Sequence, residues 1–470
     1  MNPNTPTRDL MPMAAIAAMA LAVAAAVLIG GRSPQTPVAP NTTSNAAPIA
    51  SVTPVELARE LLAAPTDLQL VDLRAVDTFA HFHLPRAQNV PAAALAGPAG
   101  SALFASKPRR VVLYGDGAND ADEAAFALQR RGHPDVHVLA GGLEAFREAI
   151  LVPPSLRAGT TEAASKAAAA TWNLQRAFFL GNRQPNPLAT WATDPTDLAA
   201  PTVVSPAWLA ARLGKVAVLD VRKRDDFLAL HIPGAQLLEL GKLRQKAGDR
   251  DLFLLGPEVL AAQFGALGVT ATTPVVLVAD EKLQDATLAA IMLLRVGHQA
   301  LAILEGGLVR WATEQRPLVA TVAAPTPATY TPRAPADDFA IEVDALAKAV
   351  QQGGTQVLDV RPPEFFRGEK STEARPGHIP GAKNRPFEQD FVRTEDGLWF
   401  RPRAELAKEY AALGLQQEQP IAVHCRTGHT ASESYFVLRY LLGYPQVRWY
   451  NGSWTEWASR QDLPAVTGGQ

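Results

Sequence analysis

Three stretches of the sequence repeat one pattern: Leu70-Val71-Asp72-Leu73-Arg74, Val218-Leu219-Asp220-Val221-Arg222 and Val357-Leu358-Asp359-Val360-Arg361. Each is a short apolar run that contains β-branched residues and ends in Asp-x-Arg. Such a run is typical of a buried parallel strand close to its carboxyl end. A pattern that recurs at wide spacing predicts related structural units along the chain.

The sequence around each copy repeats as well. A His-x-Pro-x-Ala turn follows each run, at 83–87, 231–235 and 378–382. A second apolar run comes next, at 111–114, 275–278 and 421–424, and leads into a polar loop and a helical stretch. Each copy closes with a glycine-containing turn before an aromatic residue, at 141–146, 306–311 and 451–457. Strands that alternate with helices predict an α/β fold in which helices flank a parallel sheet.

Length and composition agree with several ordinary globular domains. A chain of 470 residues exceeds what one hydrophobic core usually supports. Its residues are 47% apolar and 19% charged, which is typical of soluble folded domains. The net charge of −2 gives no reason to expect nucleic acid as a partner. We expect no cofactor and no metal ion.

The first residues form a separate segment. Leu10 to Gly30 carries no charge and is mostly aliphatic, with Arg8 before it and Arg32 after it. This predicts a signal peptide or a membrane anchor over 1–32, with no clean cleavage motif to decide between them. A polar linker follows over 33–50. In both cases the rest of the chain would be periplasmic, free or anchored to the membrane.

Cys425 is the only cysteine of the chain, so it has no partner for an intramolecular disulfide. A single cysteine can be a buried, inert residue or a reactive thiol. When the three second strands are aligned, Cys425 corresponds to Gly115 in the first unit and Ala279 in the second. The Asp-x-Arg and His-x-Pro features also occur in the two units without a nucleophile, so we interpret them as structural.

The third unit resembles the rhodanese family of sulfurtransferases. The resemblance rests on the Asp-x-Arg strand, the Gly-His-Ile-Pro-Gly-Ala turn and the loop Cys425-Arg426-Thr427-Gly428-His429-Thr430. It implies three rhodanese-like domains, each a parallel sheet flanked by helices. The predicted parts are an inactive domain at 51–152, an inter-domain segment with an alanine-rich helix at 153–202, an inactive domain at 203–318, a linker at 319–337 and a catalytic domain at 338–468.

The loop has the chemistry of a sulfur carrier. Backbone N–H groups of 426–430, together with the positive end of the following helix, can stabilise a thiolate or persulfide on Cys425. Gly428 allows the tight curl that this needs. Arg426 can bind a dianionic donor such as thiosulfate. Thr427, His429 and Thr430 complete the predicted substrate-binding loop; His429 either binds the anion or fills the loop, and Thr430 either donates to the persulfide or caps the helix.

One part of the pattern departs from the tandem-domain relatives, which place an arginine a few residues beyond Asp-x-Arg. Here that neighbourhood holds aromatic residues, which leaves Arg367, Arg375 and Arg385 as weak candidates. Phosphatase chemistry would require an arginine that closes the loop, and Ala431 and Ser432 follow instead. Two alternatives stay open: a mercaptopyruvate sulfurtransferase, and a persulfide carrier or binding module without turnover. We expect the protein to be a monomer whose partners are a small anionic sulfur donor and a thiophilic or thiol acceptor.

Overall fold

The computed structural model describes residues 49–103, 110–133, 135–181, 186–247, 250–335, 338–394 and 397–469. The predicted signal peptide or anchor at 1–32 lies outside these residues. Among the helices of the described part, none combines the length and the apolar character that a membrane crossing requires. Residues 49–470 form one compact unit.

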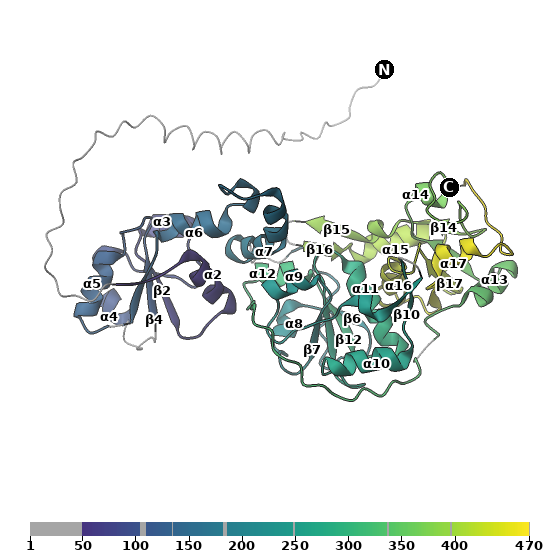
Figure 1. The fold of residues 1–470 in the computed structure, drawn as a ribbon, viewed down its shortest axis with the longest axis horizontal. Helices are drawn as coiled ribbons and strands as arrows, with labels where there is room; N and C mark the ends of the chain where they lie inside the picture. Colours follow the sequence, from purple (N-terminus) through teal and green to yellow (C-terminus); the bar gives the residue numbers. More distant parts are fainter. Residues whose placement is uncertain are drawn as a thin grey trace, which may run out of the picture. The chain divides into compact units, whose positions relative to one another are not determined.

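The first domain contains a five-stranded parallel sheet in the order β1-β5-β4-β2-β3 (Figure 1). Its central strands are buried, as the apolar runs predict. Its strands are β1 (Ala50–Val52), β2 (Leu68–Asp72), β3 (Gln88–Asn89), β4 (Arg110–Tyr114) and β5 (Val136–Leu139). Its helices are α2 (Pro54–Ala63), α3 (Val76–His81), α4 (Pro98–Leu103), α5 (Asp122–Arg130) and α6 (Gly142–Phe146).

The second domain repeats this topology in the order β6-β12-β11-β7-β8 and adds an antiparallel hairpin, β9-β10. Its strands are β6 (Thr202–Val204), β7 (Ala217–Asp220), β8 (Gln236–Leu237), β9 (Arg244–Ala247), β10 (Arg250–Leu254), β11 (Val275–Val278) and β12 (Leu301–Leu304). Its helices are α8 (Pro206–Ala210), α9 (Arg224–Ala229), α10 (Pro257–Ala266), α11 (Leu283–Arg295) and α12 (Gly307–Thr313).

The third domain has the sheet order β14-β13-β17-β18, a parallel bridge from Ala340 to Trp449 in the place of a further edge strand, and its own hairpin, β15-β16. Its strands are β13 (Gln356–Asp359), β14 (Lys383–Asn384), β15 (Phe391–Thr394), β16 (Gly397–Phe400), β17 (Ile421–His424) and β18 (Val447–Trp449). Its helices are α13 (Val343–Gln351), α14 (Pro363–Phe366), α15 (Arg403–Ala412), α16 (Ala431–Phe436) and α17 (Ser453–Ser459). The predicted fold class, parallel sheets flanked by helices, is confirmed.

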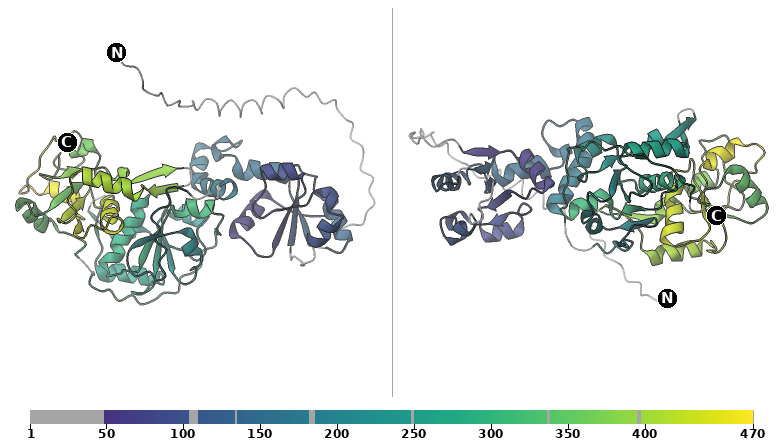
Figure 2. Two further views of the ribbon diagram at one scale, coloured as in Figure 1. Left: turned by 180° about the vertical axis from the view of Figure 1, so that it is seen from behind. Right: turned by 90° about the horizontal axis from the view of Figure 1, so that it is seen from below.

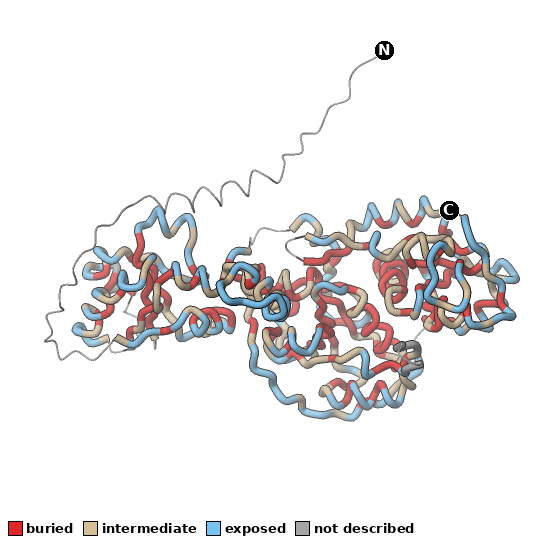
Figure 3. Tube along the Cα trace, turned by 45° about the horizontal axis from the view of Figure 1, so that its top comes forward, coloured by how far each residue is buried: buried red, intermediate tan, exposed pale blue. Residues whose placement is uncertain are grey.

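The segments between the domains are packed against them. The alanine-rich stretch forms α7 (Glu162–Leu180), as expected, and buries Phe178 and Phe179 in a core shared by the first two domains. In its described residues, 319–335, the predicted linker after the second domain forms no helix or strand of its own. Tyr330 in it is buried, and its hydroxyl lies 3.0 Å from Nδ1 of His298. A second shared core joins the second and third domains. The ribbons of these two domains lie side by side in both views of Figure 2, and Figure 3 shows buried segments in each of them.

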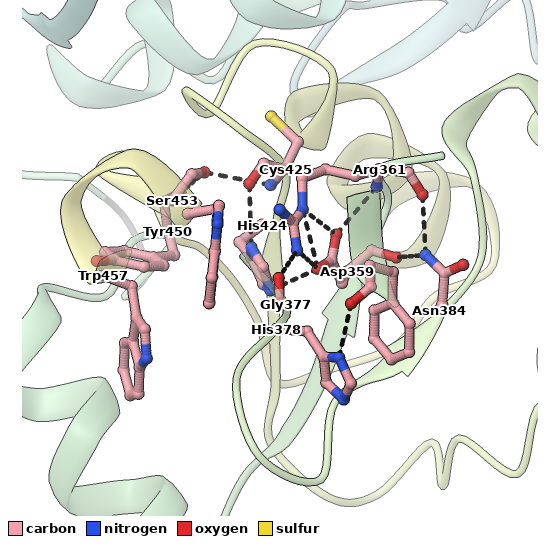
Figure 4. A network of polar contacts seen from close by, with 12 residues as sticks. Asp359, Arg361, Gly377, His378, Asn384, His424, Cys425, Tyr450, Ser453 and Trp457 are labelled. Atoms are coloured by element: carbon pink, nitrogen blue, oxygen red, sulfur yellow. Dashed lines mark hydrogen bonds and ion pairs between the residues drawn. The ribbon is translucent and has the colours of Figure 1, made fainter. Parts of the chain in front are cut away.

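The Asp-x-Arg pairs tie each central strand to the turn that follows. In the third domain Arg361 donates to Asp359 through Nη2 at 2.6 Å and to the carbonyl of Gly377 at 2.8 Å (Figure 4). The first two domains make the same bridges, to Phe82 and Leu230. In each copy the His of the His-x-Pro turn also stacks on a phenylalanine, with ring centroids 3.7–4.2 Å apart. These contacts support the interpretation of both motifs as structural.

Candidate active site

Cys425 lies directly after β17, at the carboxyl edge of the third sheet, where open α/β sheets bind ligands. It is buried, with 2% of its surface exposed. Strand pairing gives the correspondence expected from the sequence: Asp359 is opposite His424, just as Asp220 is opposite Val278. The position after each second strand is therefore Cys425 in the third domain and Ala279 in the second.

The backbone N–H and carbonyl groups of Cys425 are both hydrogen-bonded. Its N–H donates to Oγ of Ser453 at 3.2 Å, and both residues are labelled in Figure 4. Its carbonyl accepts from the N–H of Trp454 at 3.0 Å. Both partners belong to the start of α17, which begins within the glycine-containing segment 451–457. That turn thus fixes the strand end that carries the thiol.

The loop after Cys425 leaves its N–H groups available. Within the described residues, none of the N–H groups of 426–430 donates to another protein group. Gly428 has φ = +81°, and an added Cβ would lie 2.7 Å from the carbonyl of Asn451. Its own carbonyl accepts from Nε1 of Trp449 at 2.7 Å. The loop therefore curls as predicted, and unpaired N–H groups are suited to hold a sulfur anion.

Below the loop lies a buried charged network (Figure 4). Burial opposes the ionisation of Asp359, but His424 and Arg361 together hold the pKa of this carboxyl below its usual value. Burial lowers the pKa of His424, whose Nε2 lies 3.6 Å from the Asp359 carboxylate. His424 therefore faces Asp359 and supports the strand end.

Arg426 forms an ion pair with Glu373, an acidic residue that the sequence does not predict at this position. Its Nε donates to Oε1 of Glu373 at 2.8 Å, and the Glu373 side chain is only 6% exposed. The two residues border a cavity of about 240 Å³, whose other walls include Arg361, Phe365 and Trp454. Phe365 belongs to the stretch where tandem-domain relatives place an arginine. Arg426 thus places a cation on the wall of this cavity, and Glu373 partly offsets its charge.

The second domain also reaches the loop, through residues that the sequence did not indicate. Nη2 of Arg244, in β9, donates to the carbonyl of Thr427 at 2.6 Å. Nε2 of His429 lies 2.7 Å from a carboxylate oxygen of Asp285, an ion pair when the imidazole is protonated. The hydroxyls of Thr287 and Ser432 lie 2.8 Å apart. Nothing in the sequence predicts these contacts, because they depend on how the two domains pack.

The remaining predicted residues take varied places. Thr430 precedes α16 but makes no capping hydrogen bond with its side chain, so the cap alternative is not supported. Of the weak candidates, Arg375 donates to four backbone carbonyls and is structural. Arg385 pairs with buried Asp390 at 3.0 Å, and Arg367 pairs with Glu369 at 2.7 Å.

Comparison with known families finds matches in all three units. The model of the rhodanese-like domain matches residues 53–149, 205–314 and 342–460. These matches cover most of the chain and include every copy of the repeat.

Several curated proteins are similar in sequence. A putative thiosulfate sulfurtransferase of Synechococcus elongatus is 35% identical over 290 residues, which are 59% of this chain and 89% of that protein. The sulfur carrier protein TtuD of Thermus thermophilus is 35% identical over 284 residues, 57% of this chain and 96% of its own. A thiosulfate sulfurtransferase of Corynebacterium glutamicum is 32% identical over 279 residues, 57% and 90% of the two chains.

Among solved structures, an anaerobic ergothioneine biosynthesis enzyme of Chlorobium limicola, in complex with trimethyl histidine, has a similar fold. The TM-score is 0.52 at 20% identity, and the match covers 90% of this chain and all of that one. At this identity the likeness concerns the fold alone.

Proposed function

Because the chain belongs to the rhodanese family, with matches in all three of its domains, we propose that it is a thiosulfate sulfurtransferase that carries sulfur as a persulfide on Cys425. The curated relatives named above support this class of enzyme. The observation that carries the proposal is the loop of 425–430, where the only thiol of the chain is followed by N–H groups that have no other protein partner among the described residues.

The reaction takes place in two steps. The Cys425 thiolate attacks the outer sulfur of thiosulfate; the S–S bond of thiosulfate breaks with its electron pair, and sulfite leaves. In the second step an acceptor nucleophile attacks the outer sulfur of the persulfide and returns the thiolate. The loop N–H groups stabilise the sulfur anion in both states. Arg426 lies where it can bind the anionic oxygens of the donor.

The test is Cys425→Ser, which keeps the size of the side chain and removes the sulfur nucleophile. We expect thiosulfate:cyanide turnover to be abolished while the circular dichroism spectrum is unchanged. Intact-mass spectrometry of the unsubstituted chain after thiosulfate treatment should show one added sulfur atom, and Cys425→Ser should show none. Substantial turnover in the variant would refute the assignment.

A persulfide carrier that delivers sulfur to a partner protein is the second candidate, and the similarity to TtuD favours it. Both candidates load Cys425, but a carrier would discharge slowly to cyanide and quickly to its protein partner. Mercaptopyruvate carries one negative charge on its carboxylate and thiosulfate carries two, so the Arg426 cation favours thiosulfate as the donor. Comparing the single-turnover loading rate with the discharge rate to cyanide separates an enzyme from a carrier.

We also propose that the chain works outside the cytoplasm, in the periplasm, as a monomer. The uncharged run from Leu10 to Gly30 and the polar stretch after it support export. Arg244 and Asp285 of the second domain contact the loop after Cys425, so this chain supplies these contacts itself, which supports a monomer. An alkaline phosphatase fused after Pro54 should be active in an intact bacterial host, and an inactive fusion would count against export.

A further inference from the structure

The cavity of about 240 Å³ in the third domain lies next to the residue that carries the persulfide. Arg426, on its wall, follows Cys425 directly in the chain. Trp454, also on its wall, donates its N–H to the carbonyl of Cys425 at 3.0 Å. A group bound in this cavity would therefore be a neighbour of the thiol.

Trp454 is a wall that only the third domain has. The N–H of Leu143 in the first domain and that of Leu308 in the second donate to the carbonyl that corresponds to Cys425, each at 3.0 Å, so leucine occupies this position in both. Nε1 of Trp454 donates to the carbonyl of Arg375 at 3.2 Å, so the polar atom of the indole is already paired. The ring therefore offers the cavity an apolar surface.

Phe365 is a second wall that only the third domain has. It is the fourth residue after the Asp-x-Arg motif, where the second domain has Asp226 and the first has Thr78. Asp226 borders the corresponding cavity of the second domain, and so does Lys223, where the third domain has Pro362. The crevice is therefore apolar in the domain that holds the thiol and charged in the second domain. Features that only the catalytic domain has are candidates for substrate recognition.

The polar groups in the walls are balanced by partners in the protein. Nε of Arg426 donates to Oε1 of Glu373 at 2.8 Å, and the hydroxyl of Ser371 donates to the carbonyl of Glu373 at 3.2 Å. Arg361 donates through Nε and Nη2 to the carboxylate of Asp359. Each arginine thus has a carboxylate beside it. A cavity with balanced charges and aromatic walls gains most from a group that is apolar and uncharged.

We propose that the acceptor of the sulfur is a small thiol with an uncharged apolar group, and that this group binds in the cavity between Phe365 and Trp454. The inference rests on the proposed function, because it concerns the second step. The proton of the thiol passes through water to the outer sulfur of the persulfide, and the thiolate attacks that sulfur. The S–S bond breaks, its electron pair returns to Sγ of Cys425, and the acceptor leaves as an organic persulfide. An apolar cavity of about 150 Å³ can hold benzene, so about 240 Å³ is enough for a phenyl group.

The experiment follows a single discharge of the loaded chain. The full chain is loaded with thiosulfate, freed of excess donor and mixed with benzyl mercaptan, 2-mercaptoethanol or cyanide, and intact-mass spectrometry measures the loss of the added sulfur. The two thiols have similar acidity, but only the first has an apolar ring. We expect benzyl mercaptan to discharge the persulfide about ten-fold faster or more, because its ring leaves water. Equal rates for the two thiols, or a benzyl adduct on Cys425 in place of the unmodified chain, would show that the proposal is wrong.

Two variants locate the apolar group. Phe365→Ala removes one aromatic wall, and Trp454→Leu places there the residue type that the first two domains have at this position. The readout is the ratio of the two thiol rates, which a general loss of folded protein does not change. We expect this ratio to fall about five-fold or more in each variant, because less apolar surface is buried. Val466→Ala is the matched control: Val466 is an exposed apolar residue of the third domain outside the cavity wall, and its variant should keep the ratio. An unchanged ratio in both cavity variants would overturn the proposal.

The loading step separates this inference from the proposed function. If thiosulfate does not load Cys425, the proposed function fails, and a persulfide formed with inorganic polysulfide still allows the two thiols to be compared. If thiosulfate loads Cys425 but both thiols discharge it equally, only the inference about the acceptor fails. If Phe365→Ala slows loading by thiosulfate as much as discharge by benzyl mercaptan, the cavity serves the donor and the assignment to the acceptor is refuted.

Discussion

At the scale of single residues, the backbone of the loop at 425–430 and the side chain of Arg426 have different roles. The N–H groups of 426–430 face no protein acceptor within the described residues, so they can hold the sulfur. Arg426 is half-exposed and shares its charge with Glu373. The backbone therefore serves the thiolate and persulfide, whereas the arginine serves the donor.

Replacing Arg426 tests this division. In Arg426→Gly we expect kcat/KM for thiosulfate to fall about ten- to hundred-fold, because a lost charge-assisted hydrogen bond costs roughly 1.5–3 kcal/mol. The rate at which a neutral alkylating agent modifies Cys425 should change much less. The measurement compares thiosulfate, mercaptopyruvate and alkylation in one set of variants. An equal fall for thiosulfate and mercaptopyruvate would mean that Arg426 supports the loop and does not select the donor.

A second residue-scale prediction concerns Glu433, which is fully buried in α16 with no hydrogen-bond partner for its carboxyl among the described residues. Burial, and then the charge of Asp390, raise its pKa well above the usual value of 4.5. The folded chain thus binds this proton more tightly than the unfolded chain, so stability is lost as the pH rises from about 4.5 through the raised pKa.

Glu433→Gln removes the titration and keeps the shape. We expect its Tm to match that of the parent chain near pH 4.5 and to exceed it increasingly as the pH rises. Thermal unfolding followed by circular dichroism across this range checks the prediction. Glu418→Gln, on the exposed surface, is the control and should follow the parent curve. A constant difference at all pH values would show that Glu433 does not titrate in this way.

At the scale of elements, the second and third domains exchange support through their hairpins. Arg244 of β9 donates to Thr427 in the loop after β17, and Arg393 of β15 donates to the carbonyl of Glu281 in the loop after β11. Helices α11 and α16, which follow these loops, pack together. Each hairpin therefore stabilises a loop of the other domain, although only the loop of the third domain carries a thiol.

Removing one of these supports should slow catalysis without unfolding the chain. In Arg244→Met we expect kcat/KM for thiosulfate to fall about ten-fold, because the loop loses a hydrogen bond from a charged donor. Stopped-flow release of sulfite measures the loading step. The control is Arg224→Met, since Arg224 is an exposed arginine of the second domain 3.7 Å from Glu239. If both variants load at the parental rate, the hairpin contact is not needed for loading.

The sequence predicts the elements well and their contacts poorly. The apolar runs before Asp72, Asp220 and Asp359 are strong local signals, and each is a central parallel strand in the structure. Gly428 was identified because its conformation depends on its own backbone. Arg244 and Glu373 were missed because their importance comes from distant packing, and an isolated arginine or glutamate carries no signal of that.

At the scale of the whole molecule, the second and third domains share one core. Residues such as Met292 and Leu294 from α11 belong to the same buried cluster as Tyr435 and Phe436 from α16. Separating the two domains would expose large apolar surfaces to water. The two domains are therefore expected to fold and to work as a pair.

Fragments test this expectation. The fragment 153–468, which keeps α7 and the whole of β6, should unfold in one cooperative transition and keep most of the thiosulfate activity. The fragment 338–468, which keeps Cys425 but loses the shared core, should aggregate or lose most of its activity. A fragment ending at Pro325 should transfer no sulfur at all. Full activity in fragment 338–468, measured beside size-exclusion chromatography, would contradict the prediction.

The solitary, buried thiol has a kinetic consequence. With no second cysteine in the chain, no neighbouring thiol can take the outer sulfur of the persulfide, and none can attack its inner sulfur to form an internal disulfide with release of hydrosulfide. A molecule that carries the persulfide therefore keeps it until an external acceptor binds, and the lifetime of the persulfide depends on the concentration of that acceptor. At steady state the loaded fraction depends only on how fast donors load the thiol compared with how fast acceptors empty it. The fraction of molecules that carry the persulfide would therefore report the ratio of sulfur donors to sulfur acceptors around the protein.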